Sequence, residues 1–120
     1  MSNRILLVED DPAVAAVIAD ILDGADYAVD GPYQTLVDGI AAVADNMPSA
    51  AVLDIRLRDG DVNLLADDLD LYDIPYDFCS GAPDFAMMRR HPAAPLILKP
   101  ALSTELVRTH GYEYGPFQLL

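Results

Sequence analysis

The sequence predicts an α/β fold with one doubly wound, five-stranded parallel sheet. Short, nearly continuous apolar runs recur along the chain, as expected for strands that are buried on both faces. Most of them are separated by segments whose apolar residues have helical spacing. Parallel neighbours need crossover connections, which this alternation supplies, so helices should cover both faces of the sheet.

The first elements are the clearest. Residues 5–8 form a continuous apolar run and are expected to be the first strand. Asp11-Pro12 then predicts an N-cap followed by proline at the first helical position, in a helix that ends near Gly24. A weaker strand is expected at 27–29.

The middle of the chain continues the alternation. Apolar residues at 37, 40, 41 and 44 predict a second helix that stops before Pro48. Residues 50–53 form the third strand, with Asp54 at its end. A turn at 58–61 leads to a third helix around 64–69, and residues 75–79 are the fourth strand.

The last part is less regular. The fourth helix, at 84–90, should be short or irregular because prolines stand at 83, 92 and 95. Leu96–Leu98 is the fifth strand, and Ser103 opens a last helix that runs to about Thr109. We expect residues 1–110 to form one domain and residues 111–120 a C-terminal tail, with no output domain.

Composition narrows the function classes. The chain has 120 residues and a formal net charge of −13, so it should form one domain and repel nucleic acid and anionic membrane surfaces. It has no apolar run of membrane-spanning length and no signal-peptide pattern, which predicts a cytoplasmic protein. Its one cysteine, Cys79, cannot form an internal disulfide and is expected to be buried.

Polar side chains stand at the carboxyl ends of four predicted strands, where ligands bind in such sheets. They are Glu9, Asp10, Asp54, Ser80 and Lys99. Crowded carboxylates need a hard cation, which predicts Mg²⁺. Phosphoryl transfer suits the set, with Asp54 as nucleophile, Asp10 on the metal, Lys99 as ammonium clamp and the Ser80 hydroxyl on a phosphoryl oxygen.

These segments resemble the response-regulator receiver family over residues 4–107. The matching residues are Ile5-Leu6-Leu7-Val8-Glu9-Asp10-Asp11-Pro12, Ala51-Val52-Leu53-Asp54-Ile55-Arg56-Leu57, Ser80 and Lys99-Pro100. The resemblance implies a flavodoxin-like sheet of strand order 2-1-3-4-5 and phosphorylation of Asp54. It also implies that Mg²⁺ is held by Glu9, Asp10, Asp54 and the backbone carbonyl of Arg56. Ser80 and Lys99 would then sense the phosphoryl group. The family further implies that the Lys99-Pro100 bond is cis.

The family also implies partners. A sensor histidine kinase or a histidine phosphotransfer protein would donate the phosphoryl group, and a downstream effector protein would bind the product. The catalytic element would be limited to self-phosphorylation and autodephosphorylation, without turnover of a substrate.

The sequence departs from the family at several positions. Leu96 replaces the aromatic switch residue three positions before the lysine, Arg58 replaces a proline, Val62 a glycine, and Ala101 an aromatic residue. Phe78-Cys79-Ser80-Gly81 resembles the Phe-Ala-Thr-Gly subgroup of bacterial general stress signalling. These departures keep a second hypothesis open, a degenerate receiver that binds partners without phosphorylation. A Mg²⁺-dependent phosphohydrolase is a third, although its Asp-x-Asp motif and cap insertion are missing.

Three features have simpler structural interpretations. Asp11 is explained as a helix cap and needs no catalytic role. His91 and His110 are expected in solvent-exposed loops, without the spacing of metal ligands. Arg89 and Arg90 are expected to be solvated.

Overall fold

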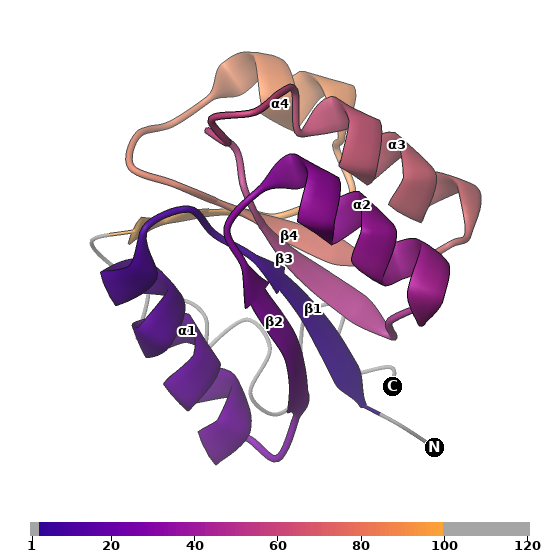
Figure 1. Cartoon of the computed structure of the whole chain (residues 1–120). Helices are drawn as coiled ribbons and strands as arrows, with labels where there is room; N and C mark the ends of the chain where they lie inside the picture. Colours follow the sequence, from indigo (N-terminus) through magenta and orange to yellow (C-terminus); the bar gives the residue numbers. More distant parts are fainter. Residues whose placement is uncertain (1–2, 100–120) are drawn as a thin grey trace.

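The computed structural model describes residues 3–99, and in them five parallel strands form one sheet of order β2-β1-β3-β4-β5. The strands are β1 (Arg4–Val8), β2 (Ala28–Tyr33), β3 (Ala50–Asp54), β4 (Tyr76–Ser80) and β5 (Leu96–Leu98). The helices are α1 (Pro12–Gly24), α2 (Leu36–Asp45), α3 (Asn63–Leu71) and α4 (Phe85–Arg90). Helix α1 covers one face of the sheet, and α2, α3 and α4 lie over the other (Figure 1). The predicted fold and strand order are confirmed.

The core has two layers because successive strand residues point to opposite faces. On β1, Ile5 and Leu7 pack with the apolar side of α1, whereas Leu6 and Val8 pack with α2 and α3. All five residues of β3 and of β4 are buried, including the polar residues Asp54, Asp77 and Ser80, as expected for central strands of a sheet that is covered on both faces. Cys79 lies in the layer beneath α1, buried as predicted.

A side-chain cap positions the first helix, and a glycine positions the second. The Asp11 carboxylate accepts hydrogen bonds from the amides of Ala13 and Val14 and Pro12 follows it, so the predicted N-cap is confirmed. In α2, Gly39 lets the helix approach β1 closely, because a Cβ there would lie 2.8 Å from Cγ2 of Val8.

The second strand is longer than expected. It pairs with β1 from Arg4↔Ala28 to Val8↔Tyr33, with a register shift between Leu6 and Val8. The sequence concealed its second half because Gly31-Pro32 has the composition of a turn. An edge strand tolerates proline, since one of its sides has no ladder to complete.

The histidine prediction was wrong for His91. The residue follows α4 directly, yet it is 5% exposed and its ring lies edge-on to those of Tyr76 and Phe78. Arg89 and Arg90 are exposed, as predicted, and Arg90 also pairs with Asp67 at 3.0 Å. The fourth helix is short, as predicted, with Asp84 as its N-cap.

Several predictions lie outside the described residues. They are the last helix at 103–109, the tail at 111–120, the cis Lys99-Pro100 bond, Ala101 and His110. Within residues 3–99, every helix is too short or too polar to cross a membrane.

Candidate functional site

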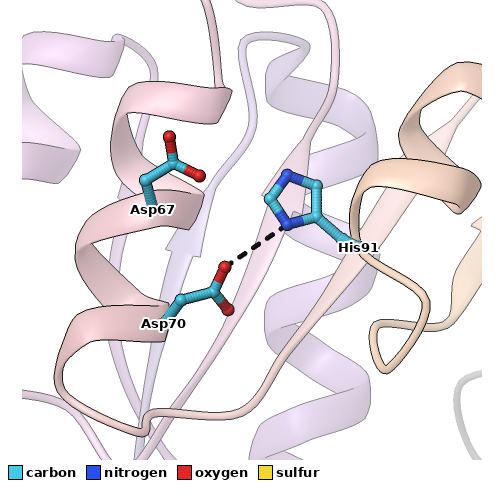
Figure 2. A group of neighbouring side chains, drawn as sticks. All are labelled: Asp67, Asp70 and His91. Carbon is cyan, nitrogen blue, oxygen red and sulfur yellow. Dashed lines mark ion pairs between the residues drawn. The ribbon is translucent and has the colours of Figure 1, made fainter.

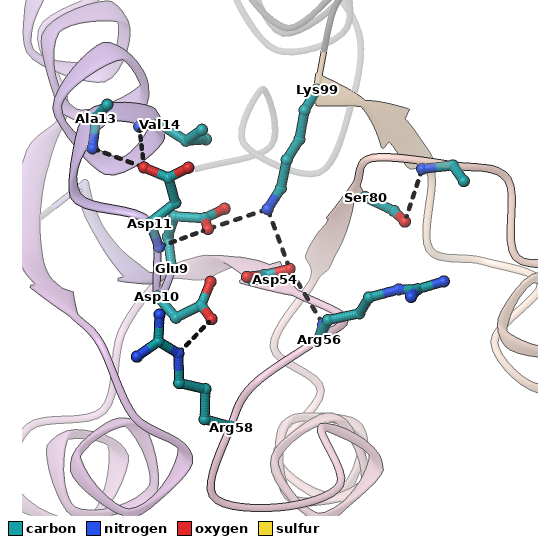
Figure 3. A network of polar contacts seen from close by, with 11 residues as sticks. Glu9, Asp10, Asp11, Ala13, Val14, Asp54, Arg56, Arg58, Ser80 and Lys99 are labelled. Atoms are coloured by element: carbon teal, nitrogen blue, oxygen red, sulfur yellow. Dashed lines mark hydrogen bonds and ion pairs between the residues drawn. The ribbon is translucent and has the colours of Figure 1, made fainter.

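Strand order brings the predicted site residues together. β3 lies between β1 and β4, and Val8 is in register with Leu53, so Glu9 and Asp10 follow β1 beside Asp54. Ligand oxygens of these three carboxylates all lie within 4.8 Å of one another. Lys99 reaches the same place from the end of β5 (Figure 3). The predicted convergence of distant segments is therefore present.

Two of the three carboxylates are buried. Glu9 is 0% and Asp54 2% exposed, and one oxygen of each, Oε1 and Oδ2, accepts no hydrogen bond from residues 3–99. Burial and the neighbouring Asp54 carboxylate raise the pKa of Glu9 to about 7. Glu9 therefore binds a proton more readily than a carboxyl group in water does.

Asp54 behaves in the opposite way. Burial acts to raise its pKa, but contacts with the Asp10 and Glu9 carboxyl groups, the Arg56 amide and the Lys99 ammonium outweigh burial, so the pKa lies below its usual value. The Arg56 amide donates to Oδ1 of Asp54 at 3.1 Å. These contacts thus favour the ionised form of Asp54.

Asp10 occupies the more open side of the cluster. Contact with the Asp54 carboxyl group, and then burial, raise its pKa. Its Oδ2 lies 3.5 Å from Nε of Arg58, whose side chain is 88% exposed. Arg58, noted in the sequence as a replacement for proline, therefore adds a cation beside the cluster, although an exposed pair of this kind contributes little stability.

Lys99 supplies the fixed positive charge. Its Nζ lies 3.1 Å from Oε2 of Glu9 and 3.4 Å from Oδ1 of Asp54. Burial acts to lower the pKa of Lys99, but the hydrogen bond to Glu9 and the charge of Asp54 raise it above its usual value. The ammonium therefore stays charged at neutral pH.

Ser80 ends β4, beside Asp54 on the side away from Glu9 (Figure 3). Its side chain is buried, and Oγ accepts a hydrogen bond from the Ala82 amide at 3.3 Å. The hydroxyl proton remains available to an acceptor in the site. The Arg56 side chain is exposed and extends away from the three carboxylates.

The donor set fits a hard divalent cation. Three carboxylates supply only oxygen ligands, and two of their buried oxygens lack hydrogen-bond donors within the described chain. Such oxygens are costly to bury unless a cation binds them. Glu9, Asp10 and Asp54 can therefore hold a metal ion, as the sequence predicted, and oxygen-only ligands favour ions of the magnesium class.

One residue that supports the site was missed. Asp59 accepts hydrogen bonds from the amides of Leu36 at 2.7 Å and Val37 at 3.0 Å, which joins the loop after Asp54 to the N-terminus of α2. These bonds lower the pKa of Asp59. The sequence showed only a turn-forming Asp-Gly pair, because a cap from 22 or 23 residues away has no local signal.

Comparisons with known proteins agree with this geometry. No protein-family model matches the chain. The HemR receiver domain of Leptospira biflexa is 31% identical, with a TM-score of 0.76 over 89% of this chain and 90% of that one. The BeF3-activated SdrG of Pseudomonas melonis Fr1 is 34% identical, with a TM-score of 0.69 over 82% and 84%. The chain belongs to the response-regulator receiver family.

Similarity to a longer relative supports the subgroup of the family that the sequence predicted. The phyllosphere-induced regulator PhyR of Methylorubrum extorquens is 30% identical over 104 residues, which are 83% of this receiver but only 39% of PhyR. This receiver thus spans about two fifths of that relative's length. Similarity to PhyR and SdrG fits the subgroup expected from Phe78-Cys79-Ser80-Gly81.

Proposed function

We propose that this receiver accepts a phosphoryl group on Asp54 in a Mg²⁺-dependent reaction and signals by protein contact. The observation that carries the proposal is the position of Asp54, a buried carboxylate whose Oδ1 lies 3.4 Å from the Lys99 ammonium, which also contacts Glu9. An anionic nucleophile beside a fixed cation is what phosphoryl transfer requires of a protein.

The donor would be a phosphohistidine on a sensor histidine kinase or a histidine phosphotransfer protein. A carboxylate oxygen of Asp54 attacks phosphorus, a new O–P bond forms, and the P–N bond to the imidazole breaks with its electron pair returning to nitrogen. The product on the receiver is an acyl phosphate. Oδ1 faces Lys99, so a phosphoryl group on that oxygen lies within reach of the ammonium.

Mg²⁺ would be held by Glu9, Asp10, Asp54 and the backbone carbonyl of Arg56. When bound, it neutralises charge on the phosphoryl oxygens. SdrG, which is 34% identical to this receiver, has been described in a BeF3-activated conformation, and this supports an acceptor site of the same kind here.

The remaining residues read the phosphoryl group. Lys99 pairs with the new charge and leaves Glu9, while the Ser80 hydroxyl donates to a phosphoryl oxygen. Ser80 also holds the Ala82 amide, so its movement is transmitted to the loop that precedes α4. An effector protein that recognises this changed surface would carry the signal further.

We infer that the receiver does not turn over a substrate. Its chemistry is limited to self-phosphorylation and the slow hydrolysis of its own acyl phosphate. The position of Arg56, two residues after Asp54 and exposed, suits control of how quickly water reaches that bond.

The test is mass spectrometry after incubation with acetyl phosphate and Mg²⁺. The expected product carries one phosphate, stable in acid and labile in base. Asp54→Asn should give none, and Asp61→Asn, an exposed aspartate in the same loop, should react normally. No adduct on the unmodified protein would favour a phosphate-independent binding module, and sustained hydrolysis of a phosphate ester would favour a hydrolase.

A further inference from the structure

We propose that Asp67, Asp70 and His91 form a second metal site, for a transition-metal ion of the zinc, nickel and copper class. The three side chains lie between α3 and α4 (Figure 2). His91 contacts Tyr76, the first residue of β4, whereas Asp54 and Ser80 are the last residues of β3 and β4. This cluster is thus separate from the acceptor site and does not depend on the proposed function.

The ligand atoms already lie close together. One atom from each of Asp67, Asp70 and His91 lies within 4.8 Å of the others. The two aspartates are three residues apart on α3 and therefore project from the same face of the helix. His91 Nδ1 lies 3.4 Å from Oδ2 of Asp70.

The imidazole is oriented as a metal ligand would be. Nε2 of His91 lies 2.7 Å from Oδ1 of Asn63, so in the Nε2–H tautomer the ring donates to that carbonyl oxygen. Ligating histidines usually donate their second ring N–H to such an oxygen, which fixes the tautomer. In this tautomer the lone pair of Nδ1 faces the Asp70 carboxylate.

The cluster has more acceptors than donors. The Tyr76 hydroxyl donates to Oδ1 of Asp70 at 2.8 Å, and its oxygen lies 2.7 Å from Nδ1 of His91. Burial and the Asp70 carboxylate raise the pKa of Tyr76, so its single proton remains in place. With a neutral ring, Nδ1 and Oδ2 of Asp70 therefore present lone pairs to each other, an arrangement that a cation between them stabilises.

Arg90, which contacts the cluster, leaves room for such a cation. Arg90 pairs with Oδ2 of Asp67 at 3.0 Å, and its side chain is 53% exposed, so it can withdraw into solvent. A cavity of about 420 Å³ borders Asp70, Tyr76 and His91 and gives an ion access. One imidazole with two carboxylates selects zinc, nickel or copper over magnesium.

The experiment is a calorimetric titration of the full chain with Zn²⁺ in excess Mg²⁺, which competes for the acceptor site. The chain contains two histidines, so His110→Gln serves as the background and leaves His91 as its one imidazole. One Zn²⁺ site should persist in this background. His91→Gln and Asp70→Asn should each weaken it by about tenfold or more, because each removes a direct ligand.

Asp73→Asn is the matched control, since Asp73 borders the same cavity and carries the same charge but is not in the ligand cluster. It should leave Zn²⁺ affinity unchanged. Asp67 and Asp70 are exposed, so their asparagine variants test the site even if His91→Gln fails to fold. Equal affinities in Asp70→Asn and Asp73→Asn, or no Zn²⁺ bound in excess Mg²⁺, would overturn the proposal.

Discussion

The ammonium of Lys99 lies 3.1 Å from Oε2 of Glu9, although 90 positions separate the two residues in the chain. This contact joins the strand at one edge of the sheet to the end of β1, across the carboxyl ends of β3 and β4. It places a cation against carboxylates that burial has deprived of water. Replacing Lys99 should therefore change both the stability of the protein and the chemistry of the site.

Lys99→Ala should destabilise the metal-free protein by about 1–3 kcal/mol, because it leaves Glu9 and Asp54 buried without their cation. Urea unfolding in the presence of EDTA measures this. Arg58→Ala is the control: Arg58 is 88% exposed and should cost less than about 1 kcal/mol. Equal effects of the two substitutions would show that the Lys99 contact contributes no more than a surface pair.

Mg²⁺ affinity should depend on pH near neutrality. Burial raises the pKa of Glu9 to about 7, so lowering the pH through 7 protonates a carboxylate that the metal needs. Apparent affinity should therefore fall from pH 8 to pH 6, which titration at fixed ionic strength measures. Glu9→Gln should bind more weakly and lose most of this dependence; an unaltered profile would assign the proton to another group.

The same shift predicts how the metal-free protein responds to pH. The folded pKa of Glu9 lies above its ordinary value of 4.5, so its contribution to stability is complete below pH 4.5 and is lost as the pH rises to about 7. Thermal melts in EDTA should show this loss, and Mg²⁺ should diminish it. A metal-free protein that becomes more stable over this range, with Glu9→Gln behaving identically, would contradict the assignment.

Asp59→Ala should destabilise the protein, since it removes the acceptor of two amide hydrogens at the start of α2. The stability of Asp59→Asn, which keeps one carbonyl oxygen as an acceptor, should lie between that of the unmodified protein and that of Asp59→Ala. Amide hydrogen exchange gives a site-specific measurement: exchange at Leu36 and Val37 should accelerate in the alanine variant. Unchanged exchange there would mean that the Asp59 carboxylate does not protect these two amides.

His91→Ala should cost about 2–4 kcal/mol, because the buried ring contacts Tyr76 and Phe78 and bonds to Asn63. An exposed loop histidine would cost less than about 0.5 kcal/mol. Chemical denaturation decides between these values. Arg89→Ala, an exposed change two residues earlier, should have little effect.

The sequence predicted the sheet and the acidic site because both depend on local patterns. Apolar runs mark buried strands, and the carboxyl ends of parallel strands always share one edge, so Asp10, Asp54 and Lys99 could be placed together without coordinates. Nothing local marks a side chain that acts on a distant element. The cap from Asp59 depends on how the loop after β3 lies against α2, and the burial of His91 depends on how α3 and α4 pack. His91 followed by Pro92 has the composition of a surface loop.

Gly39 sets a limit on engineering this domain. Replacing a helical glycine by alanine commonly gains about 1 kcal/mol. At Gly24 nothing lies within 4 Å of the added methyl group, and the exchange is sterically open. At Gly39 the same methyl group would press on Val8, the residue immediately before the acidic pair, and on Leu65. Stabilising substitutions should therefore be sought at the end of α1, and the contact between Gly39 of α2 and Val8 of β1 should be left unchanged.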